Sequence, residues 1–191
     1  MYKKCATEAS AARQRQLEQG LLAAMSKRRY EEITVSDLCE ELGIPRKSFY
    51  RYFSGKEGAL HALIDHTIQE FEMEYIPQMI VEKSNFQQGV ELYFRFWLKK
   101  KAFLDALQRS GLSGVLMERS ITNAARSALE ENRHLLPEHR TMKMESIVFA
   151  LCGLTSMVVR WHHDGYTMDV KSMSTLATRL LTQPLFPEYS E

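Results

Sequence analysis

The residues of this chain best suited to chemistry lie together, between positions 46 and 52. Three cations, two tyrosines and a serine occur in this segment: Arg46, Lys47, Ser48, Tyr50, Arg51 and Tyr52. Guanidinium, ammonium and hydroxyl groups are the donors that proteins present to phosphate oxygens and to base edges in the DNA major groove. We therefore expect these side chains to face outward and to contact double-stranded DNA.

Two short helices on either side of a glycine must position this segment. Gly43 follows Leu42 where a helix commonly ends in the left-handed conformation, and Pro45 cannot continue that helix because it lacks an N–H group. The apolar side chains that can hold the two helices at a steep angle are Leu38, Leu42, Ile44, Phe49 and Phe53. This pattern is typical of a helix-turn-helix, whose second helix enters the major groove.

Capping boxes predict where the neighbouring helices start. Thr34-x-x-Asp37 and Ser54-x-x-Glu57 both fit the pattern and predict helix starts near residues 35 and 55. Lys56 lies at the second start, where backbone N–H groups and a cation together favour a phosphate. A helical pair built only for packing is the alternative, but it would have little use for so many outward-facing donors.

Residues 11 to about 64 resemble the amino-terminal domain of TetR-family transcriptional repressors. The resemblance rests on a first helix followed by ITVSDLCEELGIPRKSFYRYFSGKEGAL, and its most specific part is the F-Y-x-x-F core with the following K-E. It implies that the second and third helices form the helix-turn-helix and that the protein is a homodimer. The positions that fall where family members contact phosphates or bases are Ser48, Tyr50, Tyr52 and Lys56.

One position departs from the family pattern. Pro45 stands where a capping serine is usual, so the recognition helix is expected to begin one residue later, and the DNA register of Arg46 and Lys47 stays open. Together with the first capping box, the expected DNA-binding residues are Thr34, Arg46, Lys47, Ser48, Tyr50, Arg51, Tyr52 and Lys56.

The basic charge of the chain is concentrated in the same region. Over all 191 residues the net charge is +1, but residues 1–56 hold 11 Lys and Arg against 7 Asp and Glu, a net charge of +4. The remainder holds 14 against 17, a net charge of −3. This asymmetry favours a nucleic-acid partner for the amino-terminal part.

Composition is typical of a soluble cytoplasmic protein. Hydrophobic residues make up 45% and charged residues 26% of the chain, which suits one or two folded domains. Cys5, Cys39 and Cys152 have no metal-binding spacing and indicate free thiols in a reducing compartment. We expect no signal peptide and no membrane partner, because the longest uncharged stretch, residues 146–159, is too short to span a bilayer.

Helical spacing continues along the whole chain and predicts an all-α fold of about nine helices. We expect a three-helix DNA-binding domain over residues 1–55 and a helical regulatory and dimerisation domain over residues 56–191. A helix over about residues 55–79 connects them and is expected to act as a lever. Beyond it, Ser84-x-x-Gln87 predicts a helix start, a later helix ends near Asn132, and Pro137 opens the next.

Two helices near the carboxyl end predict a dimer interface. Residues 147–161 are apolar on nearly all sides and therefore need burial all round. Two DNA half-sites also need two recognition helices, which a four-helix interface between two copies would supply. An ordinary intramolecular core is the alternative. The expected interface residues are Ile147, Leu151, Leu154, Val158, Trp161, Met173, Leu176 and Leu180.

Large, adaptable apolar side chains in the carboxy-terminal domain also suit a small-molecule pocket. Core packing is the alternative for the same residues, since helical spacing does not distinguish the two. The candidates are Phe94, Trp97, Phe103, Met117, Phe149 and Met157.

No catalytic, metal-binding or cofactor-binding pattern accompanies these features. His162, His163 and Asp164 are adjacent, but neighbours on a helix point about 100° apart. We therefore expect a non-enzymatic, ligand-responsive transcriptional regulator, a repressor that binds a palindromic operator as a homodimer. The alternative is a helical DNA-binding or adaptor protein without a small-molecule effector, and an enzyme ranks behind both.

Overall fold

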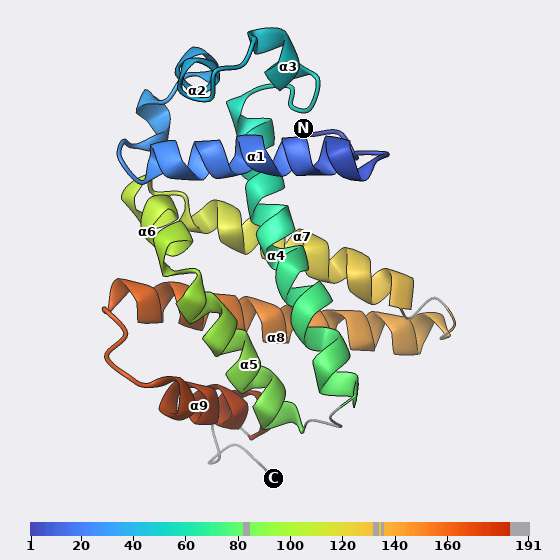
Figure 1. The fold of residues 1–191 in the computed structure, drawn as a ribbon. Coiled ribbons are helices and arrows are strands. Elements are labelled where there is room, and N and C mark those ends of the chain that lie inside the picture. The colour runs from blue at the N-terminus through green and yellow to red at the C-terminus, as the bar shows by residue number, and fades with distance from the viewer. Residues whose placement is uncertain (82–84, 132–133, 135, 184–191) are drawn as a thin grey trace. The chain divides into compact units, whose positions relative to one another are not determined.

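The computed structural model describes residues 1–81, 85–131, 134 and 136–183 (Figure 1). Within these ranges it contains nine α-helices, one 3₁₀ helix (η1) and no strand. The bounds are α1 Glu8–Met25, η1 Tyr30–Glu32, α2 Val35–Glu41, α3 Arg46–Tyr50, α4 Lys56–Val81, α5 Phe86–Lys99, α6 Lys101–Arg109, α7 Ser113–Glu131, α8 Pro137–His163 and α9 Val170–Thr182. The expected all-α fold of about nine helices is confirmed.

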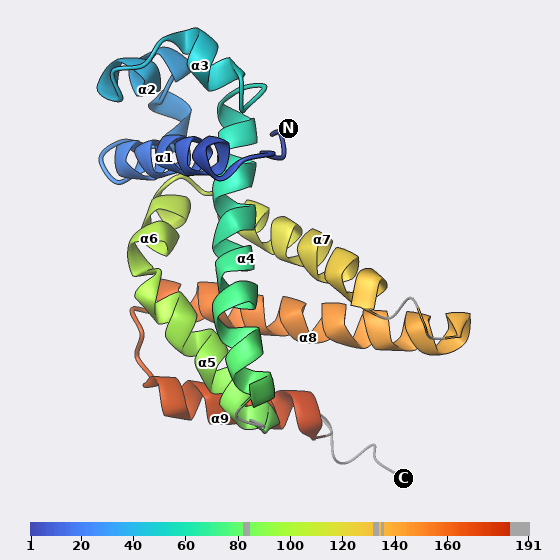
Figure 2. The ribbon, with the colours of Figure 1, turned by 45° about the vertical axis from the view of Figure 1, so that its right-hand side comes forward.

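Contacts divide the chain into two compact units that do not follow the order of the sequence. Unit 1 comprises Met1–Ile68 and Ala102–Arg119, and unit 2 comprises the described residues of Gln69–Lys101 and Ser120–Glu191. Helix α4, which Figure 2 shows as one continuous helix, therefore contributes its first part to unit 1 and its second part to unit 2. This division differs from the expected boundary near residue 55, because α6 and the start of α7 belong with the amino-terminal helices.

Unit 1 is built around the apolar face of α1. Four side chains on this face are almost completely buried: Leu17, Leu21, Ala24 and Met25. The other helices of the unit also bury Leu38, Phe49, Phe53, Leu60 and Ile64. A polar residue of α1 is buried too, since Glu18 pairs with His66 of α4 at 2.9 Å between Oε2 and Nδ1.

The turn between α2 and α3 ends the first helix as the sequence predicts. Gly43 has a φ of 61°, in the left-handed region that glycine adopts without steric cost. The N–H of Gly43 donates to the carbonyl of Glu40 at 3.1 Å, and the N–H of Ile44 donates to that of Cys39 at 2.9 Å. These bonds form a Schellman motif, and α3 begins directly after Pro45.

One of the two capping boxes expected here is confirmed. The Thr34 hydroxyl accepts the N–H of Asp37 at 3.1 Å, the Asp37 carboxylate accepts the N–H of Thr34 at 2.9 Å, and α2 begins at the next residue. The prediction for Ser54 was wrong, because its hydroxyl instead donates to the carbonyl of Met1 at 2.9 Å. Helix α4 begins at Lys56, within one residue of the predicted start.

Unit 2 has an aromatic core that involves α5, α8 and α9. Four α5 residues at helical spacing are buried: Val90, Tyr93, Phe94 and Trp97. The ring of Phe94 meets Trp161 of α8 edge-on, with centroids 5.7 Å apart. Gln87 of α5 donates to the hydroxyl of Thr175 on α9 at 3.3 Å. These contacts join α5 to both carboxy-terminal helices.

Two predicted helix ends, Ser84 and Asn132, lie outside the described residues. The capping box that the structure describes for α5 starts one residue later: Asn85 accepts the N–H of Gln88 at 3.0 Å, and Gln88 accepts the N–H of Asn85 at 2.8 Å. Pro137 is the first residue of α8, as predicted.

Helix α8 is unusually long and apolar. By length and composition alone, His139–His163 could cross a membrane, a property that core helices of soluble proteins share. Only 17% of its most apolar window is buried within the chain. A single copy of the protein therefore leaves much of the apolar surface of α8 uncovered.

Candidate nucleic-acid interface and ligand cavity

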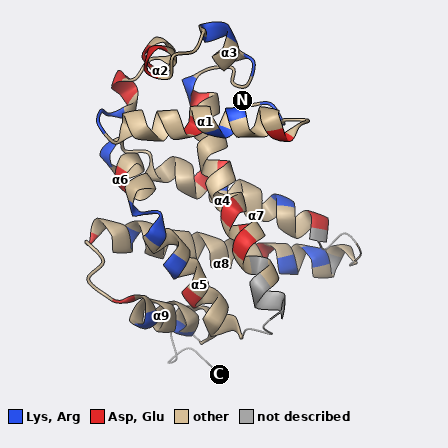
Figure 3. Ribbon diagram, viewed as in Figure 1, with Lys and Arg blue, Asp and Glu red and all other residues tan. Residues whose placement is uncertain are grey.

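Helix α3 separates one packing residue from a set of exposed donors. Phe49 is 1% exposed and anchors the helix in unit 1. The side chains of Arg46, Lys47, Tyr50 and Arg51 are exposed, as the sequence predicts, and Ser48 is half-buried. Figure 3 shows cations on α3. The helix thus presents charge and hydrogen-bond donors to solvent, and their contact with DNA stays a prediction.

Tyr52 does not face outward, and this part of the prediction was wrong. Its side chain is 8% exposed, and its ring lies next to that of Phe53, with centroids 6.3 Å apart. The reason is that α3 ends at Tyr50. The helical period that places Arg46 and Tyr50 on the surface no longer sets the direction of residue 52.

A side-chain hydrogen bond joins the start of α3 to α2. The guanidinium of Arg46 donates to the hydroxyl of Ser36, ten positions earlier in the chain. No periodicity links these two residues, so the pair could not be predicted from sequence spacing. At the start of α2, Thr34 is exposed but its hydroxyl already accepts a bond in the capping box. Bonds from Thr34, foremost its backbone N–H, lower the pKa of the Asp37 carboxyl.

Lys56 has partners that the sequence did not predict. Its ammonium donates to the carbonyls of Tyr30 and Ile33, each at 2.6 Å, and lies 3.4 Å from that of Glu31. It also lies over the Tyr30 ring, 4.2 Å from the centroid, and desolvation lowers its pKa. The ammonium would have to give up these backbone carbonyls before it could bind a phosphate, so the structure disfavours the expected phosphate contact, which stays a prediction.

Half of the expected dimer-interface residues lie in the core of their own chain. The exposed fractions of the four are 7% for Leu154, 0% for Val158, 2% for Trp161 and 7% for Met173. Ile147 and Leu151 are half-buried. The sequence could not separate these positions from the outer ones, because α8 has apolar residues on both faces and only packing selects the inner face.

A different set of apolar side chains is exposed on α8 and α9. Phe149 is 68% exposed, Leu176 40% and Leu180 42%. We call this set the outer face. Leu176 and Leu180 are expected interface residues, whereas the sequence placed Phe149 in the ligand pocket. All three also border the cavities described next, so the surface proposed for pairing and the cavities overlap.

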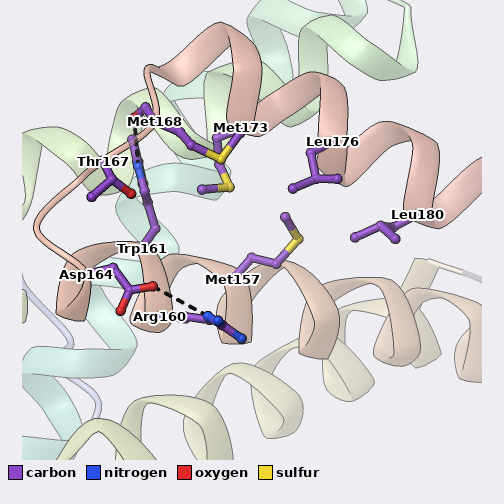
Figure 4. Close-up of a pocket in the computed structure, with 9 residues that line it drawn as sticks. All are labelled: Met157, Arg160, Trp161, Asp164, Thr167, Met168, Met173, Leu176 and Leu180. Atoms are coloured by element: carbon purple, nitrogen blue, oxygen red, sulfur yellow. Dashed lines mark hydrogen bonds and ion pairs between the residues drawn. The ribbon is translucent and has the colours of Figure 1, made fainter.

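A cavity lies between α8 and α9 in unit 2 (Figure 4). Its volume is about 350 Å³, and a second cavity of about 260 Å³ shares Met157 and Leu180 with it. The first is lined by Met157, Arg160, Trp161, Asp164, Thr167, Met168, Met173, Leu176 and Leu180. Apart from Arg160, Asp164 and Thr167, these are apolar residues, so the cavity suits a largely apolar molecule.

One end of the cavity is polar, and a hydrogen bond holds the side chain of Trp161 in its lining. Arg160 pairs with Asp164 at 3.5 Å, and the indole N–H of Trp161 donates to the carbonyl of Met168 at 2.9 Å. In Figure 4 the side chain of Met157 extends from α8 toward α9. A flexible methionine at this position can adjust the shape of the cavity to its contents.

Only two of the six expected pocket residues line these cavities. Met157 lines both and Phe149 lines the second. Phe94, Trp97 and Phe103 are at most 3% exposed and belong to the packed core, which was the alternative for them. Met117 is half-buried and belongs to unit 1.

The structure brings no metal-binding group together among the residues that it describes. In that part of the chain no three His, Cys, Asp or Glu side chains are placed to hold an ion. His163 lies 3.4 Å from the carboxylate of Asp164, and an exposed pair of this kind is an ordinary surface contact.

Comparison with known proteins places the helix-turn-helix in a family. Residues 20–63 match the family described as bacterial regulatory proteins, tetR family. The HTH-type transcriptional regulator EthR of Mycolicibacterium smegmatis is 27% identical over 127 residues, which cover 60% of this chain. The match spans 58% of the length of that relative.

Two solved structures share the fold. The dihydroxyacetone kinase operon activator DhaS has a TM-score of 0.57 and 14% identity, over 88% of this chain and 93% of its own. The fatty acid degradation regulator FadR from Bacillus halodurans has a TM-score of 0.58 and 15% identity, over 96% and 98%. With the helix-turn-helix of α2 and α3, the match over residues 20–63 identifies the amino-terminal part of the chain as a DNA-binding domain of the TetR family of transcriptional regulators.

Proposed function

We propose that this regulator is a ligand-responsive repressor that binds a palindromic operator in double-stranded DNA as a homodimer. The observation that carries the proposal is that α3 buries Phe49 but leaves the cations Arg46 and Lys47 and the phenol of Tyr50 exposed to solvent. Such a helix suits phosphate contacts, which position the protein, and base contacts, which give specificity.

Two of the expected DNA-binding residues, Tyr52 and Lys56, are left out of the proposed contact set. Tyr52 is buried, and the ammonium of Lys56 is held by carbonyls. Arg46 and Lys47 begin α3, where side chains can reach base edges, and a bidentate arginine prefers guanine. The remaining set is Thr34, Arg46, Lys47, Ser48, Tyr50 and Arg51.

The outer face supports pairing of two copies. Phe149, Leu176 and Leu180 leave apolar surface uncovered on α8 and α9, and a two-fold interface would cover it on both copies at once. Pairing would also supply two recognition helices for half-sites about 34–36 Å apart.

The cavity between α8 and α9 supports binding of a small effector. Helix α4 runs without interruption from unit 1 into unit 2, so a change in its second part is transmitted to the first. A ligand that prefers an arrangement unfit for DNA weakens DNA binding by its differential affinity, typically about 1–3 kcal/mol.

Selection of binding sites from a random DNA pool with the purified protein tests the DNA-binding part. We expect an inverted repeat to be enriched, with half-sites one helical turn apart. Recovery of sequences indistinguishable from the starting pool would contradict the proposal.

A thermal-shift screen of small molecules, followed by titration of a hit with and without the selected operator, tests the response to ligand. Linkage requires DNA to weaken ligand binding by the factor by which ligand weakens DNA binding. Identical ligand affinity in both titrations would contradict a ligand-responsive repressor and favour the DNA-binding or adaptor protein without an effector.

A further inference from the structure

The carboxyl end of α6 lies against the segment that leads into the helix-turn-helix. We call residues 26–33, between α1 and α2, the entry loop. Helix α6 stops after Arg109 because Gly111 takes a left-handed φ of 66°, with the N–H of Leu112 donating to the carbonyl of Leu107 at 2.8 Å. This stop leaves Arg109 and Ser110 beside the entry loop within unit 1.

Arg109 supplies a cation that α1 lacks. The last turn of α1 contains no basic residue, although the carbonyls at a helix end carry partial negative charge. The guanidinium of Arg109 donates to the carbonyl of Ser26 and lies 3.4 Å from that of Met25. A side chain from α6 thus binds the carbonyls where α1 ends and the entry loop begins.

Ser110 holds the middle of the entry loop. Its side chain is 4% exposed, and its hydroxyl accepts the N–H of Tyr30 at 2.9 Å. Tyr30 is the first residue of η1. A partly buried N–H that loses its acceptor is left without a hydrogen-bond partner, so this bond favours one position of the loop.

Lys56 of α4 holds the later part of the same loop through the carbonyls of Tyr30 and Ile33. Thr34 follows at once and caps α2. The entry loop is therefore held by α6 at its start and by α4 at its end, and its position fixes where α2 begins.

We propose that Arg109 and Ser110 are positioning residues for DNA binding, which orient α2 and α3 through the entry loop without touching DNA. The proposal rests on the proposed function, since it concerns the same DNA-binding surface. It adds residues that affect the orientation of the recognition helix but lie neither in the helix-turn-helix nor in α4.

The same contacts make the entry loop sensitive to displacement of α6. Helix α6 follows α5 after the single residue Lys100. A shift of α6 by the rise of one helical residue, about 1.5 Å, exceeds what a hydrogen bond of 2.9 Å tolerates. Movement of α6 along its axis would therefore release Ser26 and Tyr30 and loosen the start of α2.

The test uses Arg109→Gln, Ser110→Ala and the double variant of the full chain. Arg126→Gln is the matched control, because it removes the same charge from an exposed residue of α7. The probes are the DNA sequence selected by the parent protein and a random duplex, titrated at several salt concentrations. Amide hydrogen exchange of Tyr30 and thermal melting are measured on the same proteins without DNA.

We expect the double variant to bind the selected sequence at least tenfold more weakly than the parent and the control, with the salt slope unchanged. The Tyr30 amide should exchange faster in Ser110→Ala, and Arg109→Lys should retain most of the affinity. A salt slope lowered by about one would instead make Arg109 a direct phosphate contact and overturn the proposal.

Two further outcomes keep this inference separate from the proposed function. Unchanged Tyr30 exchange and DNA affinity within twofold of the parent in folded variants would overturn the inference alone. A parent protein that binds no DNA would overturn both the proposed function and the role of these residues in it. Should the double variant melt at room temperature, each single variant is judged by the same two measurements.

Discussion

At the scale of single residues, several side chains in and around the helix-turn-helix that could contact DNA are held within their own chain. Arg46, Tyr52 and Lys56 all fitted a DNA-binding set, yet one bonds to Ser36, one is buried and one binds carbonyls. Partners such as these are brought together by tertiary packing, which leaves no local pattern. The buried carboxylate of Asp65 is a similar case, with Arg119 as a partner that no spacing indicates.

Arg46→Ala and Lys47→Ala should each relax specificity at a symmetric pair of operator positions. A bidentate arginine contributes about 1–3 kcal/mol of discrimination between bases, which alanine cannot replace. Repeating the site selection with each variant measures the change, and Arg126→Ala serves as an exposed control on another helix. If both variants return the parental consensus, these residues do not contact bases.

Lys56→Met should destabilise the protein without changing the salt slope of DNA binding. Methionine fills the space of the lysine stem but leaves the carbonyls of Tyr30 and Ile33 without their donor, at a cost of about 1–3 kcal/mol. Denaturant melts and salt-dependent titrations give the two quantities. Arg51→Met is the control for an exposed phosphate contact, with unchanged stability and a slope lower by about one. The opposite pattern would return Lys56 to the phosphate contacts.

At the scale of elements, most helix boundaries follow from local chemistry. Gly43, Pro137 and the capping box at Thr34 mark ends that the structure confirms, because each acts through bonds within a few residues. The capping prediction at Ser54 failed because a distant segment, Met1, competes for the same hydroxyl. The inner face of α8 could not be chosen either, since apolar residues occur on both faces.

Gly43→Ala should lower the free energy of unfolding by about 1–2 kcal/mol. The left-handed φ of 61° brings a β-carbon close to the following carbonyl oxygen. Gly114→Ala is the control, because Gly114 lies in the first turn of α7 with open space around it, and alanine there should stabilise by about 0.5 kcal/mol. Chemical denaturation of both variants checks the difference, and equal effects would argue against the left-handed turn.

Asp37→Asn should lower the melting temperature at neutral pH but not in strong acid. Hydrogen bonds in the capping box lower the pKa of the folded carboxyl, so its ionised form contributes stability above the unfolded pKa of about 3.9. That contribution is lost as pH falls through the lower folded pKa. Melting curves of parent and variant from pH 7 downward should therefore converge, and a constant gap at all pH values would exclude the ionised carboxyl as the cause.

At the scale of the whole molecule, chain order and spatial organisation differ. Residues Ala102–Arg119 belong to the unit of the helix-turn-helix, although they follow the first helix of unit 2. Helical periodicity cannot predict which unit α6 belongs to, since its pattern of apolar residues would be the same for packing in either unit. The family resemblance was informative for residues 20–63, where the turn chemistry is specific, and much less so for the helices beyond.

Phe149→Glu should dissociate the proposed dimer and leave the chain folded, because Phe149 is exposed in a single copy but would be buried by a partner. Leu154→Glu should unfold the chain instead, since Leu154 lies in its own core. Sedimentation and circular dichroism separate the two outcomes. Met73→Glu changes an equally exposed residue of α4 and should do neither. An intact Phe149→Glu dimer would place the interface elsewhere.

The return of Ala102–Arg119 to the first unit limits how this protein can be recombined with its relatives. A chimaera that joins residues 1–68 to a foreign carboxy-terminal domain would lose Arg109, Ser110 and Arg119, and with them the partners of Ser26, Tyr30 and Asp65. A graft that preserves unit 1 needs three crossover points: one within α4, one at the start of α6 and one within α7. Single-crossover shuffling, in the laboratory or in a genome, should therefore yield fewer working hybrids than the linear motif suggests.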